Sequence, residues 1–214
     1  MILINFKIYK ETFGNKAVEL AKICKDVANR TKIKIIPVVS PLDVYRIKKE
    51  VGIEVWVQNV DEYMEGAKTG KISPIQAREA GAGGAIINHS ECKKSPGNIK
   101  KILSQWPDNF ISLVCLRTLG QAESWAKNIK VDLVAYEPSY LIGSKTKSVS
   151  TEKPKVVKKM AELFKGKLLV GAGVHSPEDV KAALSLGAVG VLLATDVVKA
   201  IDPEKELQEL AQAF

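Results

Sequence analysis

Residues 132–138 read Asp-Leu-Val-Ala-Tyr-Glu-Pro, a short apolar run that ends at a carboxylate and a proline. A similar arrangement occurs at residues 84–91, Gly-Ala-Ile-Ile-Asn-His-Ser-Glu, where a histidine follows the run. Near-continuous apolar runs of this length are typical of strands buried on both faces, as in a parallel sheet. Residues that follow parallel strands lie at one edge of the sheet. The two stretches therefore predict an α/β fold with its chemistry at the carboxyl ends of the strands.

Eight such apolar runs, including these two, divide the whole chain. They cover residues 2–6, 34–39, 54–59, 84–88, 111–116, 132–136, 167–171 and 190–194. Amphipathic segments separate them, and residues 15–31 show clear helical periodicity. Eight strand-then-helix units predict one (β/α)8 barrel domain over residues 1–214. A doubly wound open sheet is the competing layout, but no G-x-G-x-x-G motif follows the first run.

Prolines and glycines mark where the helices should begin and end. Pairs of a capping residue and a proline predict helix starts at Ser40-Pro41, Ser73-Pro74, Ser95-Pro96, Ser176-Pro177 and Asp202-Pro203. Glycines predict helix ends near Gly52, Gly81, Gly166 and Gly187. Two connections are long, residues 60–74 and residues 138–150, and long loops in compact domains usually carry function.

The net charge of +8, from 32 basic and 24 acidic residues, favours anionic ligands. The lysines are spread along the chain without a basic and aromatic patch, so we expect no nucleic-acid partner. No apolar run approaches the length of a transmembrane helix, and residues 1–7 lack signal-peptide features, so we expect no membrane partner. The three cysteines have no metal-ligand spacing. We therefore expect reduced thiols, no bound metal and a cytoplasmic protein.

Four polar residues follow strands at the predicted mouth of the barrel. Lys7 would place a compact positive charge there, and Asn5 points to the same side of its strand. If residues 90–92 open a helical turn, the dipole of that turn disfavours the imidazolium form of His89. A neutral imidazole can still donate a hydrogen bond to a carbonyl oxygen. Glu137 is a natural general base, because partial desolvation raises the pKa of a carboxyl group. Glu91 is expected to be an ion-pair partner of Lys7.

An anion site is predicted from the loops after the last two strands. Barrel phosphate sites are frequently built from these loops, and small residues let backbone N–H groups approach an anion closely. The candidates are Gly171, Ala172, Gly173, Ala194 and Thr195. The alternative interpretation is that these glycines only allow tight turns between strand and helix. His175, in the turn before Ser176, is expected to have no functional role.

Together the segments resemble those of triosephosphate isomerases of the short archaeal type, from residue 4 to about residue 206. The segments are Asn5-Phe6-Lys7, Asn88-His89-Ser90-Glu91, Ala135-Tyr136-Glu137-Pro138 and residues 69–74, Thr-Gly-Lys-Ile-Ser-Pro. The resemblance implies a TIM barrel that interconverts dihydroxyacetone phosphate and D-glyceraldehyde 3-phosphate without a metal or organic cofactor.

The resemblance also implies roles for single residues. Glu137 would move a proton between C1 and C2, while neutral His89 would polarise the carbonyl and move protons on the oxygens. Lys7 and Asn5 would stabilise the enediolate. Residues 138–150 would form a lid whose Gly143 amide binds the phosphate.

The third loop of this family enters the active site of a neighbouring subunit. The resemblance therefore implies a homodimer or homotetramer held partly by residues 60–74. In that assembly Thr69 would brace Asn5 or His89 of the other subunit.

The chain departs from the family in its lid and in the loop after the last strand. Ser139, Tyr140, Lys145 and Lys147 are unusual lid residues. Asp196 stands where small residues are usual, and it would weaken phosphate binding unless its side chain points away.

Two alternatives remain open from the sequence. Another phosphosugar isomerase on the same barrel would usually place acids after the first and fifth strands, where this chain has Asn-x-Lys and Cys-Leu-Arg. A non-enzymatic basic barrel that binds nucleic acid would show a steep salt dependence of its affinity.

Overall fold

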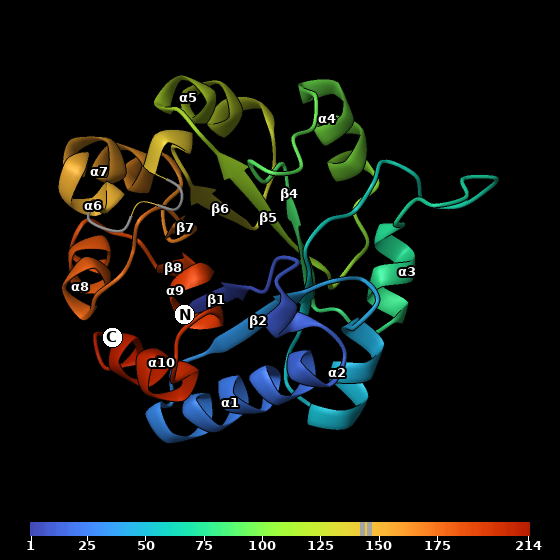
Figure 1. Cartoon of the computed structure of the whole chain (residues 1–214). Coiled ribbons are helices and arrows are strands. Elements are labelled where there is room, and N and C mark those ends of the chain that lie inside the picture. Colours follow the sequence, from blue (N-terminus) through green and yellow to red (C-terminus); the bar gives the residue numbers. More distant parts are fainter. Residues whose placement is uncertain (142–143, 145–146) are drawn as a thin grey trace.

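Parallel strands form the centre of the molecule and helices surround them (Figure 1). The computed structural model describes residues 1–141, 144 and 147–214. In this part of the chain eight strands close into a barrel in sequence order, with β8 pairing back to β1. The strands are β1 (Ile2–Asn5), β2 (Ile35–Val39), β3 (Trp56–Val57), β4 (Gly84–Ile87), β5 (Ile111–Leu116), β6 (Leu133–Tyr136), β7 (Leu168–Val170) and β8 (Gly190–Leu193). The predicted (β/α)8 barrel is confirmed, and the open sheet is excluded.

The helices follow the strands in the order expected of this barrel. They are α1 (Asn15–Thr31), α2 (Val44–Val51), α3 (Pro74–Glu79), α4 (Pro96–Ser104), α5 (Leu119–Asn128), α6 (Val149–Glu152), α7 (Pro154–Leu163), α8 (Pro177–Ser185), α9 (Thr195–Val198) and α10 (Pro203–Ala211). Two 3-10 turns, η1 (Lys10–Thr12) and η2 (Ser139–Leu141), lie in the connections after β1 and β6. None of the helices in the described ranges is long and apolar enough to cross a bilayer.

Capping explains most of the helix starts. Ser73, Ser95, Ser176 and Asp202 each accept a hydrogen bond from a backbone N–H of the first turn, and proline follows each of them. The predicted start at Ser40-Pro41 is wrong, because residues 41–43 form a turn and α2 begins at Val44.

The predicted third strand is too long. Residues 54–59 were expected to form it, and the structure assigns only Trp56–Val57. Pairing still reaches beyond these two residues, because the Gly83 N–H donates to the Val55 carbonyl over 2.9 Å. The barrel wall is therefore continuous at this point even though the regular strand is short.

Side chains that alternate along the strands divide the core into two layers. Residues such as Ile2 and Ile4 of β1 face the helices and join the large outer cluster. The barrel interior is filled by Leu3, Ile36, Val38, Trp56, Ile86, Leu113, Cys115, Leu133, Ala135, Leu169 and Leu192. The interior is thus a packed core, and the open space lies above it at the carboxyl ends of the strands.

Gly84 offers a test of this packing. A Cβ atom at residue 84 would lie 2.6 Å from the Ile111 carbonyl oxygen and 2.8 Å from the Trp56 ring. Gly84→Ala should therefore lower the free energy of unfolding by about 1–3 kcal/mol in urea titrations, as overpacked core variants do. Gly120→Ala is the matched control, since nothing lies within 4 Å of a Cβ at that position in α5. Equal stability of the two variants would contradict the prediction.

Candidate active site

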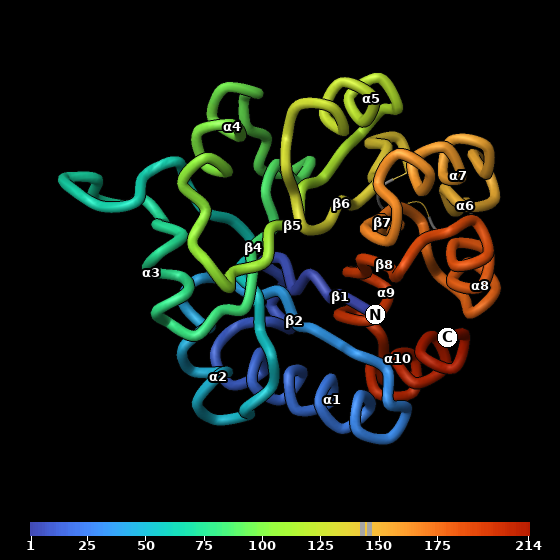
Figure 2. The backbone as a smooth tube through the Cα atoms, turned by 180° about the vertical axis from the view of Figure 1, so that it is seen from behind, coloured from blue at the N-terminus to red at the C-terminus, as the bar shows by residue number. Residues whose placement is uncertain are grey.

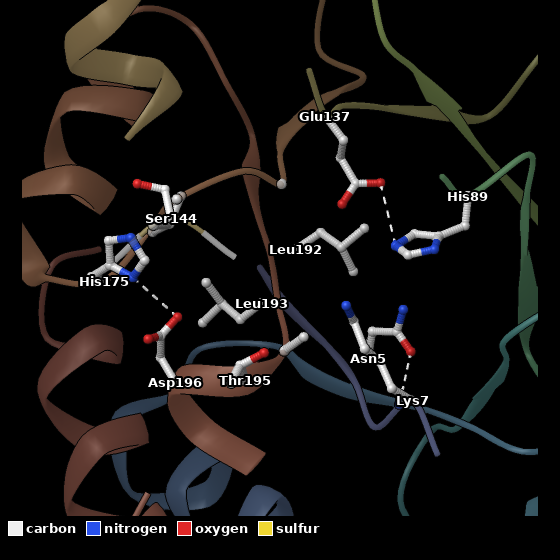
Figure 3. Close-up of a pocket in the computed structure, with 14 residues that line it drawn as sticks. Asn5, Lys7, His89, Glu137, Ser144, His175, Leu192, Leu193, Thr195 and Asp196 are labelled. Atoms are coloured by element: carbon white, nitrogen blue, oxygen red, sulfur yellow. Dashed lines mark hydrogen bonds and ion pairs between the residues drawn. The ribbon is translucent and has the colours of Figure 1, made fainter. Parts of the chain in front are cut away.

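The candidate site lies at the carboxyl ends of the strands, where polar residues continue the inward-facing rows of the barrel. Asn5 follows Leu3 by two residues, Glu137 follows Ala135, and Gly171 follows Leu169, and all three apolar residues belong to the interior cluster. Because strand residues two apart share a face, Asn5, Glu137 and Gly171 point into the same space. All three line one cavity together with Lys7 and His89 (Figure 3).

The Glu137 carboxyl group is almost fully buried, with an exposed fraction of 3%. Burial raises the pKa of this carboxyl above its usual value, while the nearby His89, the Cys115 thiol and Lys7 act in the opposite direction. Oε2 lies 3.8 Å from His89 Nε2 and has no hydrogen-bond partner among the described residues. A buried carboxylate with a raised pKa and an unsatisfied oxygen is suited to accept a proton from a small molecule.

The protonation of His89 follows from its hydrogen bond. The Glu91 N–H donates to His89 Nδ1 over 3.2 Å, so Nδ1 presents a lone pair. A neutral imidazole then carries its proton on Nε2, the nitrogen that faces Glu137 (Figure 3). The predicted turn after His89 is present, since the Cys92 N–H donates to the His89 carbonyl over 2.9 Å, but it opens no helix, because α4 begins only at Pro96. The neutral form is supported by one backbone N–H group instead of a helix dipole.

Lys7 and Asn5 bring positive charge and an amide into the cavity. Lys7 Nζ lies 2.7 Å from Glu91 Oε1, and its side chain is only 13% exposed. The ion pair predicted between these two residues is therefore present. The Asn5 side chain accepts a hydrogen bond from the Lys7 N–H over 3.0 Å, and the Gln58 amide donates to the Lys7 carbonyl. These contacts hold the lysine at the edge of the cavity.

Two residues beside the site have left-handed backbone conformations. Lys7 has φ of 50° and Asn88 has φ of 63°. Non-glycine residues adopt such angles only when the surroundings hold them there. The Asn88 side chain donates to the Cys115 carbonyl over 3.0 Å and accepts from the Lys94 N–H over 3.1 Å. These two bonds fix the chain direction just before His89.

The loops after β7 and β8 form the other end of the cavity. Gly171, Gly173, Ala194 and Thr195 line it, as does Ser144 from the connection after β6. Ala172 is buried and is not among the lining residues, so its predicted contact with an anion finds no support in the cavity. Gly143 and Lys145 lie outside the described residues.

The two glycines of the loop after β7 make close approaches that a side chain would prevent. A Cβ at residue 171 would lie 2.6 Å from Glu137 Cγ, so Gly171 leaves space for the carboxylate. Gly173 has φ of +66°, and a Cβ there would overlap the Lys147 carbonyl. The Val149 N–H also donates to the Ala172 carbonyl over 3.1 Å. The end of the predicted lid is thus attached to the loop after β7.

The unusual lid residues take different positions. Ser139 and Tyr140 form the 3-10 turn η2, in which the Tyr140 side chain is 65% exposed. Lys147 Nζ lies 3.5 Å from Glu152 in α6, so its charge is directed to that carboxylate. Thr69 lies on the segment between β3 and α3, which projects away from the chain's own barrel (Figures 1 and 2). The role predicted for Thr69, bracing the site of another subunit, stays a prediction.

Sequence reasoning did not place Cys115 or His175 in the site. Cys115 lies inside the barrel against Glu137, and burial raises the pKa of its thiol well above the usual value. His175 and Asp196 both line the cavity, and His175 Nδ1 lies 3.1 Å from Asp196 Oδ2. His175 follows Gly173 of the predicted anion site by two residues, and this short distance in the sequence could have indicated that His175 lies near the site. His175 was expected to have no functional role, and the structure places it in the wall of the cavity.

The arrangement can carry out proton transfer next to an anionic group. One end holds a buried carboxylate, a neutral histidine and a lysine, and the other end holds small residues at two loops. Among the described residues, no group of three or more His, Cys, Asp or Glu side chains is arranged to hold a metal ion.

Comparison with known proteins agrees with this chemistry. The family model "Triosephosphate isomerase" matches residues 1–213. The chain is 39% identical to the triosephosphate isomerase of Methanothermus fervidus over 216 residues, which covers 98% of this chain and 96% of that protein. It is 40% identical to the Archaeoglobus fulgidus enzyme, with the same coverage.

A solved structure shows the fold. The crystal structure of triosephosphate isomerase from Bartonella henselae matches with a TM-score of 0.69 at 24% identity and covers 96% of each chain. The full-length family match and the archaeal relatives establish more than the fold, because they extend over both ends of the cavity. The chain belongs to the triosephosphate isomerase family and is an enzyme that interconverts dihydroxyacetone phosphate and D-glyceraldehyde 3-phosphate.

Proposed function

We propose that Glu137, His89, Lys7 and Asn5 carry out this isomerisation through an enediolate intermediate. The observation that carries the proposal is that the buried Glu137 carboxylate and the Nε2 side of His89 face each other across one cavity, 3.8 Å apart. Glu137 takes a proton from the carbon next to the substrate carbonyl and returns it to the neighbouring carbon. The net change moves one hydrogen from carbon to carbon and one from oxygen to oxygen, which needs no external oxidant or reductant.

His89 and Lys7 act on the oxygen atoms of the substrate. Neutral His89 donates its Nε2–H to the carbonyl oxygen, and the bond strengthens as negative charge develops there. The Lys7 ammonium and the Asn5 amide stabilise the same charge from the other side. Glu91 supports both groups, because it forms the ion pair with Lys7 and its N–H occupies His89 Nδ1.

The phosphate group of the substrate binds at the opposite end of the cavity. We assign it to the backbone of Gly173, Ala194 and Thr195, with Gly171 beside the carboxylate and Gly143 of the lid as a further donor. Small residues at these positions let N–H groups approach the phosphate closely. Residues 138–150 act as the lid that excludes water during the reaction.

The chain is also proposed to work as a homo-oligomer, a dimer or a tetramer, through residues 60–74. This segment projects away from its own barrel (Figure 1). Exposed apolar side chains lie on the connections after β1 and β2 and in the first turn of α2, at the same end of the barrel as the site. They are Ile8, Phe13, Leu42 and Tyr45. A partner subunit would cover such a surface, because monomers rarely expose large apolar patches.

Two further expectations complete the proposal. The single closed barrel supports the interpretation of residues 1–214 as one domain. The three cysteines are free thiols, which fits a reducing cytoplasm.

Glu137→Gln tests the assignment of the base. The amide cannot accept the proton, so turnover in a coupled assay with glyceraldehyde 3-phosphate should fall by roughly 10²–10⁴-fold. Glu123→Gln is the matched control, because Glu123 forms an exposed ion pair with Lys159 far from the cavity. Turnover near the wild-type level in Glu137→Gln would exclude Glu137 as the base.

The same variant makes a prediction about stability and pH. The pKa of Glu137 is raised in the folded protein, so the folded state binds more protons than the unfolded state between the unfolded and folded pKa values. Stability contributed at this site is therefore lost as the pH rises through that interval. Glu137→Gln should be more stable than the wild type in urea at pH 7, with a smaller difference at pH 4. A variant that is less stable at pH 7 would contradict this.

The oligomer is tested by shortening residues 65–70 to two glycines. Light scattering should show a lower mass than the wild type. Turnover should fall on the order of a hundredfold, because small displacements of catalytic groups are costly. Unchanged urea unfolding of the barrel serves as the control for folding. A wild-type chain that is a fully active monomer would exclude the role proposed for Thr69.

A further inference from the structure

We propose that His175 is a specificity-determining residue for the phosphate group of the substrate, because its imidazolium form neutralises the Asp196 carboxylate at that end of the cavity. The proposal rests on the proposed function, since it takes the phosphate to lie at the loops after β7 and β8.

The geometry places the two side chains at the phosphate end. His175 Nδ1 lies 3.1 Å from Asp196 Oδ2, and the side chains are 19% and 37% exposed. Both line the same cavity as Lys7 and Glu137. In Figure 3 they lie on the side opposite to Glu137 and His89, next to Thr195. They are therefore separated from the proton-transfer groups but remain part of the same cavity.

The loop after β7 orients the histidine. The His175 N–H donates to Asp179 Oδ2 over 3.1 Å, and the same oxygen accepts from the Ser176 N–H over 3.2 Å. The second of these bonds is part of the capping box that begins α8, and the first ties His175 to the same carboxylate. The backbone of His175 is thus attached to a stable helix start, and its ring turns towards α9, where Asp196 lies.

Acidic residues on three neighbouring elements lie around His175. Asp196 faces it from α9, Asp179 bonds its backbone from α8, and Glu206 interacts with it electrostatically from α10. Burial is the main cause that raises the pKa of Glu206, and the neighbouring carboxylates Glu209 and Asp196 add to it. On the lid side the Lys147 ammonium is directed to Glu152.

This pairing explains how an acidic residue is compatible with an anionic substrate. A bare Asp196 carboxylate would repel a phosphate dianion across the few ångströms of the cavity. Two charges interact strongly at such distances when solvent is partly excluded. With His175 protonated, the pair is neutral overall and the repulsion is cancelled. Without His175, the repulsion is restored and binding of the phosphate weakens, while proton transfer at the other end is unaffected.

The test compares His175→Gln, Asp196→Asn and the double variant with the wild type. His175→Gln should raise KM for glyceraldehyde 3-phosphate on the order of tenfold, with kcat changed by less than about threefold. Asp196→Asn should keep or lower KM. The double variant should return KM to within about threefold of the wild type, because no carboxylate remains to be neutralised. Glu204→Gln is the control. It removes an equal charge from α10, where Glu204 forms an exposed pair with Arg30 of α1, and it should leave KM and kcat unchanged.

Sulfate supplies a readout that does not depend on turnover, because its charge is constant from pH 5.5 to 8.5. Its affinity, measured by calorimetry, should fall with rising pH more steeply in the wild type than in His175→Gln. Glu137 is present in both proteins, so the difference between their two pH dependences reports on His175 alone.

Two results would overturn the proposal. One is an unchanged KM in His175→Gln, and the other is an equal rise of KM in His175→Gln and in the double variant. Failure of the proposed function would look different, since the wild type would then lack isomerase activity or Glu137→Gln would retain it.

Discussion

The whole site depends on holding one carboxylate in a nearly dry position at the mouth of the barrel. Glu137 is only 3% exposed and sits above the packed interior, with Cys115 and Ala135 in the layer beneath it. Gly171 leaves the space that its side chain occupies. Burial of a carboxylate is unfavourable for folding, so this position is a place where stability is given up for reactivity.

The backbone around the carboxylate is held by contacts between successive loops. Gln58, after β3, binds the carbonyl of Lys7, and Asn88, after β4, binds the carbonyl of Cys115. The Gly173 loop, after β7, packs against the Lys147 carbonyl of the lid. Each catalytic segment is therefore positioned by a neighbour that lies far away in the chain. The unusual φ angles of Lys7 and Asn88 persist because these contacts restrain them.

Charge is balanced separately at the two ends of the cavity. Lys7 lies beside Glu91 at the end that carries Glu137, and His175 lies beside Asp196 at the end formed by the loops after β7 and β8. At both ends a basic side chain lies beside a carboxylate that is more exposed than the basic side chain. Such pairs contribute little to stability at a partly solvated surface. Their effect is to fix where positive charge is presented to an anionic substrate.

The sequence by itself determined the barrel, most of the helix starts and the segments that carry Asn5, Lys7, His89 and Glu137. Buried parallel strands and capped helices leave local patterns, because apolar runs, prolines and glycines act within a few residues. Tertiary structure decided which side chains meet. Asp196 looked unfavourable and His175 looked unimportant, because no local pattern links residues 175 and 196. Only the pairing of β7 with β8 sets these strands side by side, so that the two loops that follow them share one cavity. The tautomer of His89 was also settled by a contact, the Glu91 N–H, where the sequence suggested a helix end.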